Sequence, residues 1–220
     1  MKNDYSHIKV IGFDLDQTLY PKSPDIDEAI QVYIYKKIAT HKNVTVGESK
    51  KLFSDLYREG NGLSGRKTLI ELEIPDASEI IQEALENADI ASILEPDESV
   101  SVLLKKLKEQ YKNIDIITGS NNDQTKKKLK ALSISENIFN HIIVDEDASK
   151  SDGEAYRLWI SRYGEFNSSE FLYIGDREGP DHEVPSSLGI KTILVNVQKV
   201  NPDIDIPQLK SIQSIDSFLL

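Results

Sequence analysis

Two acidic residues stand two positions apart directly after the first apolar run of the chain. They are Asp14 and Asp16, in the segment Asp14-Leu15-Asp16-Gln17-Thr18-Leu19, and the apolar run is Ile8 to Phe13. In open α/β folds sites form at the carboxyl ends of the strands, and a carboxylate can act as a covalent nucleophile toward phosphorus. An ordinary acidic turn explains the same pair when it is taken alone.

Two later apolar runs also end in polar residues that suit phosphate and metal chemistry. Thr118-Gly119-Ser120 follows one of them, and the backbone N–H groups of such a turn can bind phosphate oxygens. Polar caps on a plain strand-to-helix turn explain this segment as well. Asp176 follows the other run, with a further acid at Asp181, and magnesium prefers oxygen ligands. Acids and a hydroxyl at three separate strand ends indicate one shared site.

The elements that must position these residues alternate between strand-length apolar runs and helical segments. The predicted strands are Ile8 to Phe13, Ile114 to Ile117, His141 to Val144, Phe171 to Ile174 and Thr192 to Val197. The helical segments between the later runs are Ser99 to Tyr111, Asp123 to Leu132 and Gly153 to Tyr163. Strands that are apolar on both faces and alternate with helices predict an α/β, Rossmann-like parallel sheet with helices on both faces.

One stretch, from about Tyr20 to Glu95, shows only helical periodicity. Its candidate helices are Ile26 to Thr40, Gly47 to Arg58, Lys67 to Glu73 and Ala77 to Ile90. The sequence therefore predicts an α/β catalytic core over 1–19 and 96–220, with an inserted all-helical cap domain over 20–95. We expect this cap over the carboxyl end of the first strand, where ligands bind in such sheets.

Composition excludes several kinds of function. Apolar residues make up 39% of the chain and charged residues 29%, as expected of a globular protein with a buried core. The net charge of −11 would repel nucleic acid and anionic lipid, so we expect no nucleic acid polymer and no membrane among the partners. The lysine runs Lys105 to Lys108 and Lys126 to Lys128 have helical spacing, so we expect them on solvated helix faces.

Few kinds of metal and redox chemistry are open to the chain. It has no cysteine, which excludes disulfides, thiolate zinc sites and cysteine nucleophiles, and its four histidines lack metal-ligand spacing. It has no apolar run of about 18 residues, and no basic segment precedes an apolar stretch near its first residue. We expect a cytoplasmic protein that is a monomer or a weak dimer, because no heptad pattern indicates stable association.

The ordered motifs resemble those of the haloacid dehalogenase superfamily of phosphohydrolases. They are Phe13-Asp14-Leu15-Asp16-Gln17-Thr18-Leu19, Thr118-Gly119-Ser120, a lone lysine, and Gly175-Asp176 followed by Asp181. The lysine is Lys150, because Lys150-Ser151-Asp152-Gly153-Glu154-Ala155-Tyr156 looks like the lysine, turn and helix of that family. A surface lysine beside an acidic loop is the alternative. The resemblance covers the sheet-forming two thirds of the chain.

The resemblance implies a role for each matched residue. Asp14 would be the nucleophile that forms an aspartyl-phosphate, and Asp16 would protonate the leaving oxygen and then activate water. Thr118, with the backbone of Gly119 and Ser120, would hold the phosphoryl group. Because dehalogenating members need no acid for the leaving group, Asp16 favours phosphoryl transfer.

The resemblance also implies a magnesium site and a charge partner for the phosphate. Asp14, the main-chain carbonyl of Asp16, and Asp176 would bind Mg²⁺. Asp181 would hold a metal-bound water or orient Lys150, and Lys150 would offset the negative charge of the phosphate and of Asp14.

Two positions depart from the pattern of the family. Pro180 stands where many members have Asn, and Arg177 stands where many have Ser, which leaves the geometry of the metal side open.

The sequence predicts a magnesium-dependent phosphatase for a small phosphorylated metabolite, such as a nucleoside monophosphate or a sugar phosphate. A phosphomutase of the same superfamily and a non-catalytic phospholigand-binding module are the alternatives. The cap is similar to that of pyrimidine 5'-nucleotidase-like members. Tyr57 and the glycine-rich segment Gly60 to Gly65, followed by Arg66 and Lys67, suggest the hypothesis of a loop that reads the substrate. A plain glycine-rich turn between two cap helices is the alternative.

Overall fold

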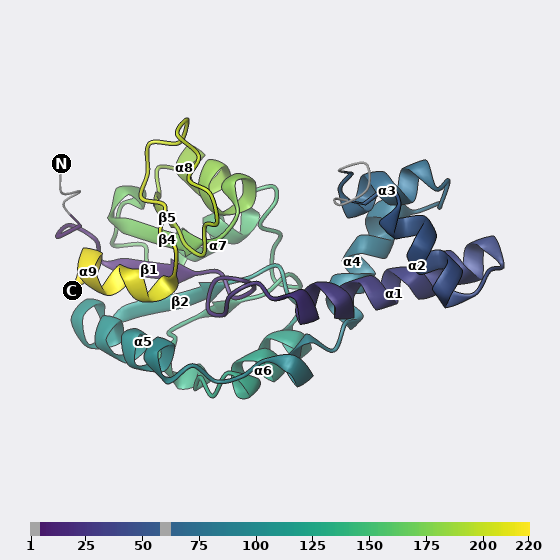
Figure 1. Ribbon diagram of the computed structural model, residues 1–220. Helices are drawn as coiled ribbons and strands as arrows, with labels where there is room; N and C mark the ends of the chain where they lie inside the picture. Colours follow the sequence, from purple (N-terminus) through teal and green to yellow (C-terminus); the bar gives the residue numbers. More distant parts are fainter. Residues whose placement is uncertain (1–4, 58–62) are drawn as a thin grey trace. The chain divides into compact units, whose positions relative to one another are not determined.

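The computed structural model describes residues 5–57 and 63–220 (Figure 1). Within these residues the chain forms two compact units. One comprises residues 5–22 and Leu94–Leu220, and the other comprises Ser23–Ile93. We call them the α/β unit and the helical unit.

The described part of the α/β unit contains a five-stranded parallel sheet. Its strands are β1 (Val10–Phe13), β2 (Asn113–Ile117), β3 (Ile142–Ile143), β4 (Phe171–Gly175) and β5 (Lys191–Leu194), in the spatial order β3-β2-β1-β4-β5. The helices that follow the insertion are α5 (Glu98–Tyr111), α6 (Asn122–Ala131), α7 (Glu154–Ser161), α8 (Val184–Ser187) and α9 (Asp216–Leu219). Figure 1 shows α5 and α6 on one side of the sheet and α7 and α8 on the other. The predicted α/β fold with a parallel sheet is confirmed.

The central strands are buried because their residues are apolar toward both layers of helices. All four residues of β1 and all five of β4 are buried. On the α7 side the core gathers around Trp159, which packs edge-on against Phe171 with ring centroids 4.9 Å apart. On strand β2, Asp115 is fully buried and accepts hydrogen bonds from Trp159 Nε1 at 2.8 Å and from the Tyr163 hydroxyl at 2.7 Å. This carboxylate therefore ties α7 to the sheet.

Three of the predicted strands are shorter in the structure than in the sequence pattern. β1 begins at Val10 and not at Ile8, and the edge strand β3 covers only Ile142–Ile143, which pair with β2. β5 ends at Leu194, and beyond it Val197 N donates to Leu209 O at 3.0 Å. The apolar run after Leu194 thus pairs with a later segment of the chain.

Helices account for most of the described residues of the helical unit. They are α1 (Pro24–Lys42), α2 (Val46–Ser54), α3 (Gly65–Glu71) and α4 (Ala77–Asn87), followed by the short 3-10 helix Ile90–Ile93. Hydroxyl caps begin the first three: the side chains of Ser23, Thr45 and Ser64 each accept a backbone N–H of the first turn. Ile38, Phe53, Leu69 and Ala84 are buried in the core of this unit.

The position of the helical unit as a cap over the sheet stays a prediction. Part of the predicted glycine-rich loop, namely Gly60 and Gly62, lies outside the described residues.

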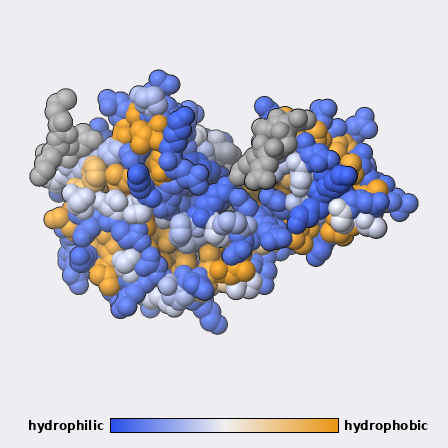
Figure 2. Space-filling model, in the orientation of Figure 1, coloured by the Kyte–Doolittle hydropathy of each residue, from blue (hydrophilic) through white to orange (hydrophobic). Residues whose placement is uncertain are grey.

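The surface of the described residues is largely polar. Hydrophilic residues predominate on the face shown in Figure 2, and hydrophobic residues occur there in small groups. Among the described helices, none has the length and hydropathy needed to cross a membrane.

Candidate active site

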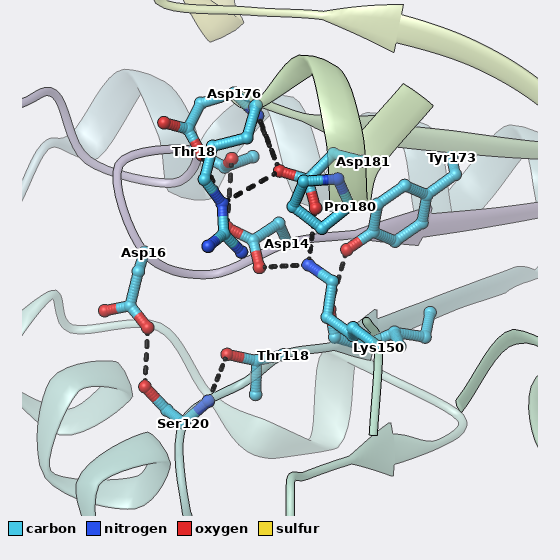
Figure 3. A network of polar contacts seen from close by, with 12 residues as sticks. Asp14, Asp16, Thr18, Thr118, Ser120, Lys150, Tyr173, Asp176, Pro180 and Asp181 are labelled. Carbon is cyan, nitrogen blue, oxygen red and sulfur yellow. Dashed lines mark hydrogen bonds and ion pairs between the residues drawn. The ribbon is translucent and has the colours of Figure 1, made fainter. Parts of the chain in front are cut away.

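Three neighbouring strands deliver their polar end residues to one place (Figure 3). β1 lies between β2 and β4, so Asp14 after β1 has Thr118 on one side and Asp176 on the other. Asp14 N donates to Ile174 O at 2.8 Å, which continues the β1–β4 ladder by one residue and fixes the backbone of Asp14. The order of the sheet therefore builds the site at the carboxyl end of its central strand.

A buried lysine joins two of the acids. Lys150 Nζ lies 2.7 Å from Asp14 Oδ1 and 2.6 Å from Asp181 Oδ1, and all three residues are buried. The ammonium also lies 5.1 Å from the centroid of the Tyr173 ring. Such a charge is tolerated in the interior only when it is paired and hydrogen-bonded, as it is here. The predicted lysine is thus in direct contact with the predicted nucleophile.

Asp181 can approach the end of β4 only because residue 175 is a glycine. A Cβ atom placed on Gly175 would lie 2.4 Å from Asp181 Cβ. Asp181 Oδ2 accepts hydrogen bonds from the backbone N–H groups of Asp176 at 3.2 Å and Arg177 at 3.0 Å. The π-helical turn Gly179–Glu183 carries Asp181 into this position. The departures from the family pattern, Arg177 and Pro180, therefore lie in a loop that the structure anchors firmly.

Three carboxylates form a group that could hold a metal ion. Asp14, Asp176 and Asp181 each offer one oxygen, and these oxygens lie within 4.8 Å of one another. Asp176 Oδ1 is buried and accepts no hydrogen bond from the residues that the structure describes. Arg177 Nε is 3.9 Å from this oxygen and 3.6 Å from Asp181 Oδ2. A buried carboxylate oxygen that lacks a hydrogen bond, within an all-oxygen set, fits a hard divalent cation such as Mg²⁺.

The electrostatics of this group favour an added positive charge. Burial raises the pKa of Asp14 to about 6. The Lys150 charge lowers this pKa and the Asp181 charge raises it, but burial has the largest effect. Burial also raises the pKa of Asp176 to about 7, and the charges of Asp14 and Asp181 add to the rise. The pKa of Asp181 is lowered, because Lys150 and Arg177 outweigh the effect of its burial. The ionised forms of Asp14 and Asp176 are therefore disfavoured where the two side chains meet, and a bound cation would stabilise them.

Asp16 belongs to a second polar group, and Figure 3 shows its carboxylate directed toward Ser120. Its Oδ1 accepts hydrogen bonds from the Tyr20 hydroxyl and from Lys128 Nζ, each at 2.5 Å, and its Oδ2 accepts one from the Ser120 hydroxyl at 2.5 Å. We call these four residues the Asp16 cluster. Burial alone would raise the pKa of Asp16, but the Lys128 charge and the three hydrogen bonds outweigh it and lower the pKa.

Lys128 is the site residue that the sequence pattern misplaced. We expected Lys126 to Lys128 on a solvated helix face, and this is wrong for Lys128, of which 1% is exposed. Lys126 and Lys127 are exposed, whereas Lys128 shares the buried face of α6 with Thr125 and Leu129. The helical spacing of Thr125, Lys128 and Leu132 was the available signal, because residues three and four apart lie on one face.

The turn after β2 contributes hydroxyl and backbone groups. Thr118 is buried, and its Oγ1 accepts the backbone N–H of Ser120 at 3.1 Å. Ser120 thus uses its N–H within the turn and its hydroxyl on Asp16. Gly119 is exposed, and a Cβ atom added there would meet no heavy atom within 4 Å. The predicted binding of phosphate by Thr118, Gly119 and Ser120 stays a prediction.

The match to a family model identifies the chain. A model described as haloacid dehalogenase-like hydrolase matches residues 11–195. The chain belongs to the haloacid dehalogenase-like hydrolase family. The predicted family and the prediction of a hydrolytic enzyme are therefore confirmed, while the nucleotidase-like branch stays a prediction.

Solved structures of this fold cover nearly the whole chain. A phosphatase of the family from Thermococcus onnurineus has 17% sequence identity and a TM-score of 0.67, over 96% of this chain and 98% of its own. A putative hydrolase of the family from Bacillus subtilis, bound to magnesium, has 18% identity and a TM-score of 0.61, over 97% and 99%. A putative β-phosphoglucomutase from Thermotoga maritima has 19% identity and a TM-score of 0.61, over 97% and 100%. At these identities the likeness shows a shared fold.

Proposed function

We propose that this hydrolase is a magnesium-dependent phosphatase that cleaves a small phosphate monoester through an aspartyl-phosphate on Asp14. The observation that carries the proposal is the contact of buried Lys150 with Asp14, beside three carboxylates that can hold a metal ion. A phosphate dianion repels an attacking carboxylate, so a site for this reaction needs positive charge next to the nucleophile. Lys150 supplies one such charge, and the carboxylate group provides a place for a second.

Asp14 would attack through Oδ2. Its Oδ1 is held by Lys150 at 2.7 Å, whereas Oδ2 accepts a long hydrogen bond of 3.4 Å from the Thr18 hydroxyl. A new bond forms between this oxygen and phosphorus, and the bond from phosphorus to the leaving oxygen breaks. Asp16 would give the leaving oxygen a proton, which requires its contact with Lys128 to open first, because the Lys128 charge holds the pKa of Asp16 down. In the second step Asp16 takes a proton from water, whose oxygen attacks phosphorus and releases phosphate from Asp14.

The remaining residues would hold the charges in place. Asp181 contacts Lys150 at 2.6 Å, which supports an orienting role toward this lysine. Asp14, the main-chain carbonyl of Asp16, and Asp176 would hold Mg²⁺, with Asp181 close enough to bind a metal-bound water. When bound, Mg²⁺ would neutralise charge on the phosphate and align it with the nucleophile. Thr118 and the backbone of Gly119 and Ser120 would hold the phosphoryl oxygens.

The substrate class is a nucleoside monophosphate or a sugar phosphate, selected by the helical unit acting as a cap over 20–95. Tyr57, Arg66 and Lys67 belong to that unit, and Arg66 Nε donates to Ser78 Oγ at 2.8 Å, which ties the start of α3 to α4. We propose a cytoplasmic monomer or weak dimer, in keeping with the net charge of −11 and the polar face in Figure 2.

A phosphomutase is the second candidate, because it would use the same two acids and return the phosphoryl group to a sugar. The Thermotoga maritima structure described as a putative β-phosphoglucomutase shares the fold. A product assay separates the two functions: the phosphatase yields free phosphate, and the mutase yields an isomerised sugar phosphate.

Replacing the nucleophile tests the proposal. In Asp14→Asn we expect phosphate release to fall on the order of 10³-fold or more, because the amide cannot form the covalent intermediate. The measurement is phosphate release from nucleoside monophosphates, sugar phosphates and an aryl phosphate, with Mg²⁺ and with a chelator. Asp203→Asn, an exposed residue of the same unit, is the control. Turnover in Asp14→Asn equal to that of the wild type would refute the mechanism.

A further inference from the structure

Asn196 joins two loops of the α/β unit that lie far apart in the sequence. It lies just beyond β5, and its side-chain Nδ2 donates to Gln17 O at 2.7 Å and to Thr18 O at 3.2 Å. These acceptors lie 179 and 178 residues earlier in the chain, in the loop after β1 that carries Asp14 and Asp16. One amide group therefore holds the backbone of the loop that supplies both acids.

The segment that carries this amide is itself held in place. In the sheet, β4 lies between β1 and β5, and Val195 N donates to Gly175 O at 2.8 Å, which continues the β4–β5 ladder up to Asn196. Asn196 has a φ of 56°, in the left-handed region that asparagine adopts more readily than most residues. The side chain thus extends from a fixed backbone, past the end of β4, to the loop after β1.

Gln17 has a backbone conformation that glutamine rarely adopts. Its φ is 59°, and for a residue with a Cβ atom this left-handed conformation costs energy and persists only where the surrounding contacts maintain it. Leu15 O accepts the backbone N–H groups of Thr18 at 3.3 Å and Leu19 at 3.1 Å. Together with these turn hydrogen bonds, the two bonds from Asn196 keep Gln17 in this conformation.

The φ of Gln17 determines where the carbonyl group of Asp16 points. The peptide group that joins the two residues is planar, so rotation about the N–Cα bond of Gln17 turns this carbonyl relative to the rest of the loop. With the negative φ that glutamine prefers, the carbonyl would point in another direction. This carbonyl is the main-chain ligand that the proposed function assigns to Mg²⁺.

We propose that Asn196 is a positioning residue for the metal ion: by holding Gln17 in the left-handed conformation, it directs the main-chain carbonyl of Asp16 toward Mg²⁺. The inference rests on the proposed function, because that proposal makes the carbonyl a ligand. Its consequence is that removal of the Asn196 amide weakens Mg²⁺ binding although every ligand residue is still present.

The test is Asn196→Gly, which removes the amide, leaves the net charge unchanged and adopts a positive φ freely. We expect the Kd for Mg²⁺, measured by isothermal titration of the purified proteins, to rise about tenfold. Asn43→Gly is the matched control, because Asn43 is an exposed asparagine with a φ of 54° in the helical unit, and its Kd should equal that of the wild type. An unchanged Kd in Asn196→Gly would overturn the inference.

A double-mutant cycle with Gln17→Asn gives a readout that a merely loosened loop would not reproduce. Asparagine adopts the left-handed region more readily than glutamine, so less is left for Asn196 to maintain. In the Gln17→Asn background we expect Asn196→Gly to raise the Kd for Mg²⁺ by about threefold or less. An equal rise in both backgrounds would contradict the role assigned to Asn196.

A second variant keeps the test open if Asn196→Gly does not fold, as judged by circular dichroism. Asn196→Asp keeps the size of the side chain and its tolerance of a positive φ, but an ionised carboxylate cannot donate to the two carbonyl groups. We expect Mg²⁺ to bind about threefold more weakly or worse, although the added negative charge alone would favour a cation. Equal or tighter binding would overturn the inference.

Asp176→Asn, titrated in parallel, separates this inference from the proposed function. Loss of Mg²⁺ binding in that variant, with an unchanged Kd in Asn196→Gly, would leave the proposed metal site standing and remove only the inference on Asn196. Full Mg²⁺ binding in Asp176→Asn, or none in the wild type, would remove the proposed metal site and the inference together.

Discussion

At the residue scale, Arg177 places a positive charge against the carboxylates that would hold the metal ion. Its Nε lies 3.9 Å from Asp176 Oδ1 and 3.6 Å from Asp181 Oδ2. The proposed divalent cation would enter the field of this guanidinium, so like charges would oppose each other during binding. The side chain is 54% exposed, and solvent screens much of the repulsion.

We therefore expect Arg177→Ser to bind Mg²⁺ roughly three- to tenfold more tightly than the wild type, a modest gain because the charge is screened. Isothermal titration of Mg²⁺ into the purified proteins measures this directly, without reference to turnover. Arg157→Ser is the matched control, because Arg157 is an exposed arginine that pairs with Glu154 on α7. Weaker Mg²⁺ binding in Arg177→Ser would show instead that the guanidinium supports the site.

Some residues of the site could be predicted from the sequence and others could not. Asp14, Thr118 and Asp176 could be found because each follows a strand, and the ends of neighbouring parallel strands meet. Lys128 could not be separated from Lys126 and Lys127 by residue type. Its burial depends on which face of α6 meets the sheet, and its partner lies more than a hundred residues away.

At the element scale, the junction of β2 with α7 depends on one buried carboxylate. Asp115 Oδ2 accepts hydrogen bonds from Trp159 and Tyr163, and Oδ1 accepts the backbone N–H of His141 at 2.7 Å. Burial raises the pKa of Asp115, and these three hydrogen bonds only partly oppose the rise. Because the pKa of Asp115 in the folded state lies above the usual 3.8, the folded protein favours the protonated carboxyl group over the charged carboxylate.

The stability that protonated Asp115 contributes is fully present below pH 3.8. It is lost as the pH rises through the raised pKa of the folded state. Asp115→Asn should lack this loss of stability with rising pH. At pH 7 the variant should still be less stable by about 1 to 3 kcal/mol, because an amide cannot accept all three hydrogen bonds.

Urea unfolding followed by circular dichroism between pH 4 and pH 8 gives both quantities, and Asp123→Asn on the exposed face of α6 is the control. A pH dependence of the unfolding free energy equal to that of the wild type would count against the role assigned to Asp115.

Elements were predictable to within a few residues wherever side-chain periodicity decides them. The predicted helix Ser99 to Tyr111 and the predicted strand Phe171 to Ile174 each differ by one residue from the observed elements, α5 and β4. The turn Gly179–Glu183 was not predictable, because its π-helical form depends on Asp181 fitting against Gly175 and accepting two backbone N–H groups. Contacts of this kind leave no periodic trace in the sequence.

At the scale of the whole molecule, a segment whose described residues are mainly helical lies between the first and second strands of the α/β unit. The sequence predicts a helical cap domain there, because strand-length apolar runs give way to helical spacing, and the role of the segment as a cap stays a prediction. The substrate was not predictable in the same way. The selection that we propose for the helical unit would depend on side chains whose placement follows from tertiary contacts, such as that of Arg66 with Ser78, and not from a repeating pattern.

The two units also make it possible to measure metal binding in one of them alone. Trp159 is the single tryptophan of the chain, and it is buried in the α/β unit against Phe171. Its fluorescence therefore follows unfolding of the unit that carries Asp14, Asp176 and Asp181, whatever the helical unit does.

Metal removal should lower the stability of that unit. The three carboxylates repel one another in the folded state, and a ligand that binds only the folded state stabilises it by mass action, by about 2.7 kcal/mol at a hundred times its Kd. We expect Mg²⁺ to raise the Tm read from Trp159 fluorescence and a chelator to reverse the rise, at constant ionic strength.

In Asp176→Asn the rise of the Tm should largely disappear, since the variant loses a carboxylate whose buried oxygen lacks a hydrogen bond. Asp152→Asn, an exposed residue beside the lysine loop, should keep the full rise. An equal rise in Asp176→Asn would place Mg²⁺ binding outside the three-carboxylate group.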